Sequence, residues 1–156
     1  MKRLESVAVP QPAPGTDFEY QPGYLDAFKV VGFTARFVTS AVVASRYNTF
    51  QLTDVSGNVI YAIGNPTAID ANTTALYAGA SSGSFTANNI VWQPLAVIGT
   101  WPELWVPPLA RFGSLTPGIS AGDQWSNVYL LCEVGDWAED QRALERAVAA
   151  MAAAAS

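Results

Sequence analysis

The amino-acid sequence predicts an all-β protein, a two-sheet antiparallel β-sandwich with an extended N-terminal arm and a C-terminal α-helix. Apolar and polar residues alternate through about seven or eight short segments, which is typical of half-buried strands. Glycine, proline and asparagine separate these segments, and no helical period occurs before residue 135. We therefore divide the chain into an arm at 1–23, a sandwich domain at 24–134 and a helix at 135–156.

The arm contains four prolines and shows neither a strand period nor a helical one. Proline fixes φ and lacks an N–H donor, so we expect an extended segment that stays out of the middle of a sheet. With no internal ladder to join, it should be disordered in a monomer and ordered in an assembled particle. These residues fit either a disordered tail or an arm that lies along a neighbouring subunit.

The most regular strand patterns lie at 29–38, 49–53, 59–63 and 126–134. Weaker ones lie at 75–78, 89–93, 95–98 and 109–115. On the first strand, the apolar face comprises Val31, Phe33, Ala35 and Phe37. On the last strand, it comprises Val128, Leu130, Cys132 and Val134. The dry faces should meet in one contiguous core that contains Phe33, Phe37, Phe50, Leu52, Val128 and Leu130.

The loop at 54–58 joins two of these strands and predicts a hairpin. Its Asp-x-Ser-Gly-Asn sequence is reminiscent of a calcium loop. It lacks the downstream glutamate and the full alternation of oxygen ligands, so a plain turn is the better interpretation.

The chain carries few charges for its length. Only 13% of its 156 residues are charged, against about 25% in an average soluble protein. No charged residue lies between Asp70 and Glu103. Either a large β core is covered by Thr, Ser and Asn, or other protein chains cover much of the surface. We favour the second explanation.

Charge also excludes some partners. The net charge of −5 disfavours nucleic acid as a partner. Lys2 and Arg3 are too few for a polybasic membrane anchor. No apolar run reaches membrane-spanning length, and the first residues lack the apolar region of a signal peptide.

The sequence offers no constellation for chemistry. Histidine is absent, which excludes Ser-His-Asp and Cys-His devices and His-liganded metals. The single Cys132 excludes an internal disulfide, and its place on a dry face predicts a buried structural thiol. The acidic residues near the aromatic segment are Glu103, Asp123 and Glu133, and their spacing does not require any two of them to lie together as a catalytic carboxylate pair. We predict no catalytic, cofactor-binding or metal-binding residue, and no enzyme.

Three tryptophans are candidates for ligand stacking, and they are Trp92, Trp101 and Trp105. Exposed and clustered, they could hold a carbohydrate, although tryptophan at a proline-rich sheet corner usually packs. This is the alternative function, a receptor- or carbohydrate-binding module.

A helix follows the break at Gly135. Asp136 can cap it, with Glu139 three residues on, and its alanines favour helix. Its large apolar side chains fall on one narrow stripe, which comprises Trp137, Leu144, Val148 and Met151. A narrow stripe suits a groove on a neighbouring subunit better than a docked position across a sheet. These residues are the candidate assembly contacts.

The order of turn and strand motifs carries a resemblance. The motifs are Pro22-Gly-Tyr24, Phe33-Thr-Ala-Arg-Phe-Val-Thr-Ser40, Ala44-Ser-Arg46, Asp54-x-Ser-Gly-Asn58, Trp105-Val-Pro-Pro108 and Gly118-Ile-x-Ala-Gly-Asp-Gln124. Over about residues 20–134 the chain resembles small jelly-roll structural proteins of tailed bacteriophages, which are minor capsid, decoration or tail-associated components of the virion. It departs from them in the uncharged segment between Asp70 and Glu103.

The resemblance implies a jelly-roll sandwich and a non-enzymatic role in the virion, in multiple copies and without a cofactor. The partners would be other copies of the chain and other virion proteins. A receptor-binding tail component is the alternative within the same family.

Overall fold

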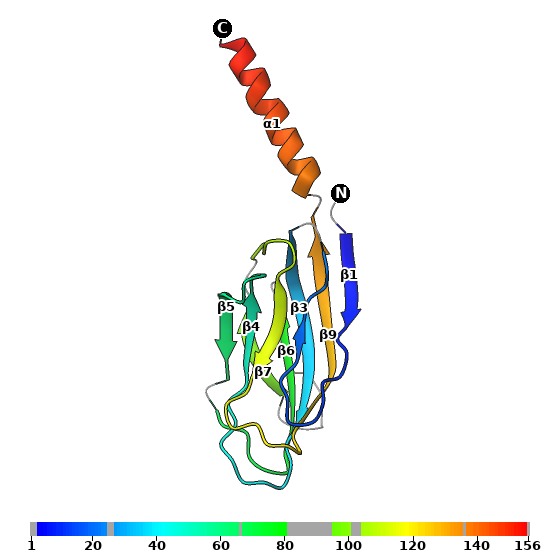
Figure 1. The fold of residues 1–156 in the computed structure, drawn as a ribbon, viewed down its shortest axis with the longest axis vertical. Coiled ribbons are helices and arrows are strands. Elements are labelled where there is room, and N and C mark those ends of the chain that lie inside the picture. Colours follow the sequence, from blue (N-terminus) through cyan, green and yellow to red (C-terminus); the bar gives the residue numbers. More distant parts are fainter. Residues whose placement is uncertain are drawn as a thin grey trace.

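The computed structural model describes residues 3–24, 27–65, 67–80, 95–100, 104–135 and 137–155. These residues form two packed sheets and a helix that extends beyond them (Figure 1). One sheet consists, in spatial order, of β1 (Arg3–Ala8), β9 (Gln124–Val134), β3 (Phe28–Val38), β6 (Thr74–Ala80) and β7 (Leu95–Thr100). The other consists of β2 (Glu19–Tyr20), β8 (Arg111–Leu115), β4 (Thr49–Thr53) and β5 (Val59–Gly64). The helix is α1 (Trp137–Ala154).

The strands pair in the order of a long hairpin rolled up on itself. The first strand pairs with the last, β1 with β9, and the next ones inward pair as β2 with β8, β3 with β6 and β4 with β5. All four pairs are antiparallel, and together they define a jelly roll. The predicted all-β sandwich and its jelly-roll character are confirmed.

One pair of described strands departs from the antiparallel prediction, because β6 and β7 run parallel. A parallel pair needs a crossover connection, since the chain must return to the end where it started. Residues 81–94 lie between these two strands, and the strand predicted at 89–93 is outside the described residues.

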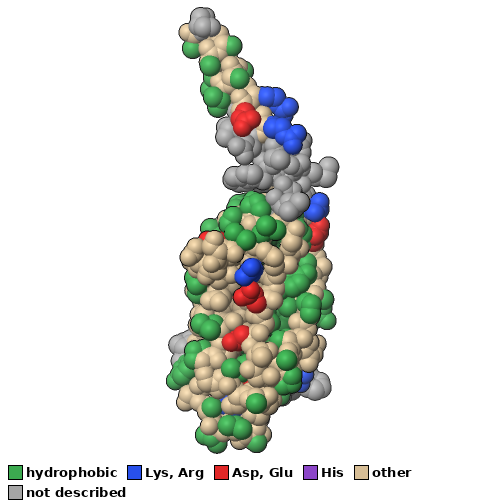
Figure 2. All heavy atoms as spheres, in the orientation of Figure 1, with side chains coloured by type: hydrophobic (Ala, Val, Ile, Leu, Met, Phe, Trp, Pro, Cys, Tyr) green, Lys and Arg blue, Asp and Glu red, His purple; other side chains and the backbone are tan. Residues whose placement is uncertain are grey.

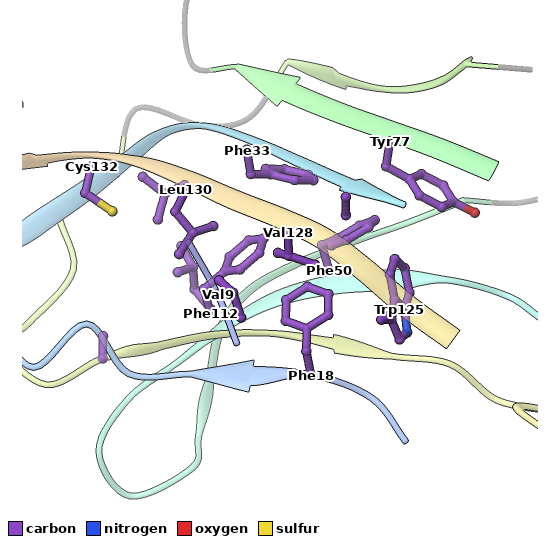
Figure 3. Packing of buried hydrophobic residues seen from close by; sticks show 14 of the residues in the cluster. Val9, Phe18, Phe33, Phe50, Tyr77, Phe112, Trp125, Val128, Leu130 and Cys132 are labelled. Carbon is purple, nitrogen blue, oxygen red and sulfur yellow. The ribbon is translucent and has the colours of Figure 1, made fainter. Parts of the chain in front are cut away.

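A layer of aromatic rings fills the space between the sheets (Figure 3). Phe50 from β4 lies at its centre, with its ring centroid 4.8 Å from that of Phe33 on β3 and 5.6 Å from that of Trp125 on β9. The sequence-predicted core, which is Phe33, Phe37, Phe50, Leu52, Val128 and Leu130, is fully buried in one cluster. That prediction is confirmed.

Strand β3 carries an irregularity that the sequence pattern does not reveal. Its pairing with β9 shifts register between Val30 and Gly32. A bulge inserts one residue and so reverses the inward and outward faces on either side of it. Val30 is therefore buried with Phe33, and Val31, predicted to point inward, is only half-buried. The assignment of Val31 to the dry face is wrong for this reason.

The hairpin of β4 and β5 forms as predicted, and its turn is held by Asp54. The carboxylate accepts hydrogen bonds from the side chain and backbone of Asn58 and from the backbone N–H of Ser56. These bonds, those from Asn58 first, hold the pKa of Asp54 below its usual range. The loop is an Asx-type turn, in agreement with the sequence.

The N-terminal arm belongs to the sandwich, contrary to the expectation that it has no internal ladder to join. Strand β1 pairs with β9 and β2 with β8, so each lies at the edge of a sheet. The four prolines lie outside both strands, at 10, 12, 14 and 22, so no ladder donor is lost. Val9 and Phe18 are buried in the core.

Asp17 fixes the arm between its two strands. Its carboxylate accepts hydrogen bonds from the hydroxyls of Ser114 and Thr116 and from the indole N–H of Trp125, at 2.6–3.2 Å. The backbone N–H of Thr116 donates to its other oxygen. These bonds tie the arm to β8 and β9, which supports an ordered arm in the monomer.

Cys132 is fully buried on the inner face of β9, as predicted. Burial raises the pKa of its thiol to about 12. A thiol that stays protonated is a poor nucleophile and a poor metal ligand.

Phe37→Ala tests the core. Phe37 is fully buried, and its ring centroid lies 4.6 Å from that of Trp125. The substitution should lower the free energy of unfolding by about 3–5 kcal/mol, because it opens a cavity that the sheets cannot close. Denaturant titration measures this loss. Tyr129→Ala, at a half-exposed ring on the outer face of β9, is the control and should cost clearly less. A loss below about 1 kcal/mol for Phe37→Ala would contradict the packing.

Candidate functional site

Helix α1 is the first candidate surface. Figure 1 shows it continuing past the end of β9 and pointing away from both sheets. Every side chain that the structure describes on this helix is exposed, including Val148 at 52% and Met151 at 65%. Trp137 and Leu144 lie within α1, but their side chains are outside the described part of the chain. The half of the predicted stripe that can be observed is therefore uncovered.

Among the side chains that the structure describes on α1, the charged ones precede the large apolar ones. Arg142, Glu145 and Arg146 come before Val148 and Met151 along the helix, and Figure 2 shows blue and red side chains on the part of the helix nearer the sandwich. Beyond them the sequence is alanine with Val148 and Met151. The distal half therefore offers a small apolar surface on which another backbone could approach closely.

The junction between β9 and the helix is closely packed. The backbone N–H of Gly135 donates to the carbonyl oxygen of Ala27 at 3.1 Å. A Cβ at Gly135 would lie 3.2 Å from the ring of Trp105. Glycine therefore ends the strand where the chain passes an indole ring. The predicted cap at Asp136 falls outside the described residues.

Trp105 is the one stacking candidate among the described residues, and it packs at this junction. The ammonium of Lys29 lies 5.3 Å from the centroid of its ring, within the range of a cation–π contact. The same ammonium lies 3.3 Å from the carboxylate of Glu133. Trp92 and Trp101 lie outside the described residues. Whether the three rings form a platform stays a prediction.

A second apolar surface lies on the outer face of the first sheet. Leu4 on β1 and Tyr129 and Leu131 on β9 are exposed by 64%, 49% and 41%. In the register of these two strands, Ser6 lies opposite Leu131 and Ala8 opposite Tyr129. The face is thus uncharged along most of this pair, with an ion pair only at the end near α1, where Lys29 faces Glu133.

The opposite end of the sandwich is held by a buried ion pair that the sequence analysis missed. Arg46 and Asp123 are fully buried, and the guanidinium Nε donates to the carboxylate at 2.5 Å. The carboxylate also accepts from the backbone N–H groups of Ser40 and Ser120. The remaining guanidinium nitrogens donate to the carbonyl oxygens of Val42 and Ala44. Every charged group of the pair is therefore hydrogen-bonded.

This pair joins the loop between β3 and β4 to the loop before β9. Burial alone would raise the pKa of Asp123, but the bonds from Arg46, Ser40 and Ser120 hold it below its usual range. The fixed loop presents Val42 and Val43, exposed by 56% and 91%, at this end of the molecule. Arg46 ends the Ala-Ser-Arg motif and Asp123 lies in the Gly-Asp-Gln motif, so both residues were visible in the sequence. Their partnership was not, because 77 residues separate them.

The carboxylates weighed for catalysis have structural roles. Asp123 pairs with Arg46 and Glu133 with Lys29. They lie just before and near the end of β9, so about 30 Å of strand separates them. A glycosidase pair needs at most about 10 Å. Glu103 lies outside the described residues. Within the described ranges, no three His, Cys, Asp or Glu side chains group as metal ligands.

The described part of the chain also contains no helix with the length and apolar character needed to cross a bilayer.

Comparison of the sequence with protein-family models gives no match, and comparison with curated proteins gives none. The fold is similar to chains in solved structures of infectious bursal disease virus. A chain of its T13 viral particle is 17% identical over 85% of this chain, with a TM-score of 0.40. A chain of the Gx strain is 13% identical over 87%, with a TM-score of 0.42. A chain of the VP2 subviral particle is 14% identical over 87% of this chain, with a TM-score of 0.38.

The present chain spans only about a third of those chains, from 31% to 34% of their length. With TM-scores below 0.5, these matches assign neither a family nor a function to it.

Asp123→Asn tests the buried pair. The substitution leaves the Arg46 guanidinium buried without a counter-charge and should lower the free energy of unfolding by about 3–5 kcal/mol at pH 7. Glu19→Gln removes an exposed ion pair with Arg111 and should cost less than about 1 kcal/mol. Both are measured by denaturant titration. Equal effects of the two variants would contradict a structural role for the buried pair.

The difference in unfolding free energy between wild type and Asp123→Asn should become smaller as the pH falls. Folding lowers the pKa of Asp123 from its ordinary value of 3.8. The ionised carboxylate therefore stabilises the folded state fully above that value, and this stabilisation is lost as the pH falls through the folded pKa. The gap between the two unfolding free energies should therefore narrow below about pH 4. A constant gap from pH 7 to pH 3 would contradict this assignment.

Proposed function

We propose that this protein is a non-enzymatic structural component of a tailed-bacteriophage virion. It assembles in multiple copies, as a capsid decoration protein, a minor capsid protein or a component of the connection between head and tail. Its partners are other copies of itself and other virion proteins, and its place is the virion.

The observation that carries the proposal is the position of α1. A helix of this length is marginal in water unless it packs against something. Here it extends from a sandwich that has already buried its own core, and Val148 and Met151 remain exposed. Within the described residues these side chains are not covered by the sandwich, and an exposed amphipathic helix suits a groove on another subunit. The alanines around the stripe allow a close approach of backbones.

Two further properties support a role in assembly. The charged fraction of 13% leaves a surface that is poorly suited to a solitary soluble protein. The turn and strand motifs that resemble virion jelly-roll proteins lie on the observed jelly-roll topology, at the loops 54–58 and 118–124 and in the strand at 33–38. The net charge of −5 argues against a direct contact with the packaged nucleic acid.

Removal of residues 138–156 tests the role of α1. The sandwich keeps its core, so the melting temperature should change by less than about 4 °C. Self-association or attachment to the particle should be lost. Differential scanning calorimetry measures the first quantity, and sedimentation velocity with a particle-binding assay measures the second.

A pair of substitutions separates the apolar stripe from the helix itself. Val148→Ala with Met151→Ala removes the two large apolar side chains of the distal half of the stripe and raises helix propensity, so lost assembly cannot come from a lost helix. Glu145→Ala with Arg146→Ala is the matched control and should assemble normally. If the truncated chain unfolds, or if it assembles as well as wild type, α1 is not the assembly element. If the stripe variant assembles as well as wild type, the distal half of the stripe is not the contact.

A further inference from the structure

Strand β5 forms one edge of the second sheet. In the described residues its one neighbour is β4, and Figure 1 places it on the outside of the sandwich. Its sequence is Val-Ile-Tyr-Ala-Ile-Gly, without a charge or a proline. Val59 and Ala62 are exposed. An edge strand presents a row of backbone N–H and C=O groups that can pair with another strand.

Proteins usually protect such edges with charge, proline, a bulge or short length. Strand β1, at the edge of the first sheet, carries Arg3 and Glu5, and β2 is two residues long. Strand β5 has a register shift only where it begins, between Leu52 and Thr53 of its neighbour. From 61 to 64 it pairs with 49–52 without interruption. Strand β7, the other edge of the first sheet, is likewise uncharged, but its ladder with β6 shifts register between Ala78 and Ala80 after three consecutive pairs. Of the four edges of these sheets in the described residues, β5 keeps the longest uninterrupted run of pairs without a charge on the edge strand.

We propose that β5 pairs antiparallel with β5 of a second copy of this chain. The contact is isologous, since a two-fold axis relates the two strands and each contributes the same residues. It would join the two four-stranded sheets into one continuous sheet. This inference rests on the proposed multi-copy role and names one contact between the copies.

The charge pattern fits a second copy as the occupant and favours an antiparallel pair. The strand has no charge, so self-pairing brings no like charges opposite each other. Asp54 lies in the turn that precedes β5, and its lowered pKa keeps it ionised. A parallel pair would place the two Asp54 carboxylates side by side. In an antiparallel pair they lie at opposite ends, separated by about 20 Å of strand.

The outward side chains also permit this pairing. Ala62 lies opposite Gln51 of β4, and Gln51 lies opposite Gly113 of β8, so the row is small or uncharged over these three strands. It ends at Glu19 on β2, at the far edge of the sheet. Because Ala62 is near the middle of the strand, a two-fold axis brings it close to its own copy. A charge introduced there meets the same charge in the partner.

The experiment uses Ala62→Lys and Ala62→Glu in the full-length chain, studied by sedimentation velocity over a range of concentrations. Wild type should associate as concentration rises. Each variant should associate about tenfold more weakly or worse, because like charges face each other across the axis. An equimolar mixture of the two variants should recover association, since lysine then faces glutamate. Gln11→Lys, at an exposed residue outside every described strand, is the control and should behave as wild type.

Hydrogen exchange on wild type gives a second measurement that needs no substitution. Amides of β5 should become more protected as concentration rises, while those of β1 should not change. Recovery in the mixture excludes misfolding as the cause of the single-variant defect. A monomeric wild type, unaltered association of both variants, or no recovery in the mixture would overturn the β5 contact.

The proposed function fails separately from this inference. Association that survives Ala62→Lys but disappears on removal of 138–156 rejects the β5 contact and keeps the role of α1. Association that survives the truncation but disappears with Ala62→Lys rejects the role of α1 and keeps the β5 contact.

Discussion

The packing of aromatic rings between the two sheets is the constraint on which the rest of the structure depends. Phe50 contacts rings from both sheets, with Phe33 and Trp125 on one side and Phe112 on its own sheet. Phe18, from the N-terminal segment, packs edge-on against Trp125 at 5.3 Å. This layer contains rings from both the N-terminal segment and the last strand. Burying it therefore brings these two parts of the chain together. The pairing of β1 with β9 follows from that closure.

A core that closes in this way leaves a helix and a strand edge uncovered in the part of the chain that the structure describes. The strands bury the large apolar side chains of the sandwich among themselves, and α1 contributes none that the structure describes. The second sheet ends at β5, an edge strand without a charge. Neither the exposed face of α1 nor the free edge of β5 contributes to the core of the monomer. The helix and the edge therefore carry the functional proposals, while the buried Arg46–Asp123 pair keeps the far end rigid.

The sequence predicts those features that depend on local periodicity. Alternation identified the inner face of β9 and the core residues, because a strand with one dry face must repeat every two residues. It failed at Val31, where a bulge breaks the period, and at the arm, where prolines flank the strands without entering them. The partnership of Arg46 with Asp123 depends on tertiary contact alone, which no local pattern encodes. The position of α1 away from the sheets was predicted from its narrow apolar stripe, and of that stripe the structure describes Val148 and Met151, which are exposed.

Hydrogen exchange of the free, full-length chain tests the central claim most directly, namely that the sandwich is complete without its helix. Core amides of β9 should exchange only through global unfolding and be slowed on the order of 10³-fold or more. Amides at 138–155 should exchange far faster, because an unpacked helix frays, and should become protected when the protein assembles. Equal protection of α1 and β9 in the free chain would contradict the account.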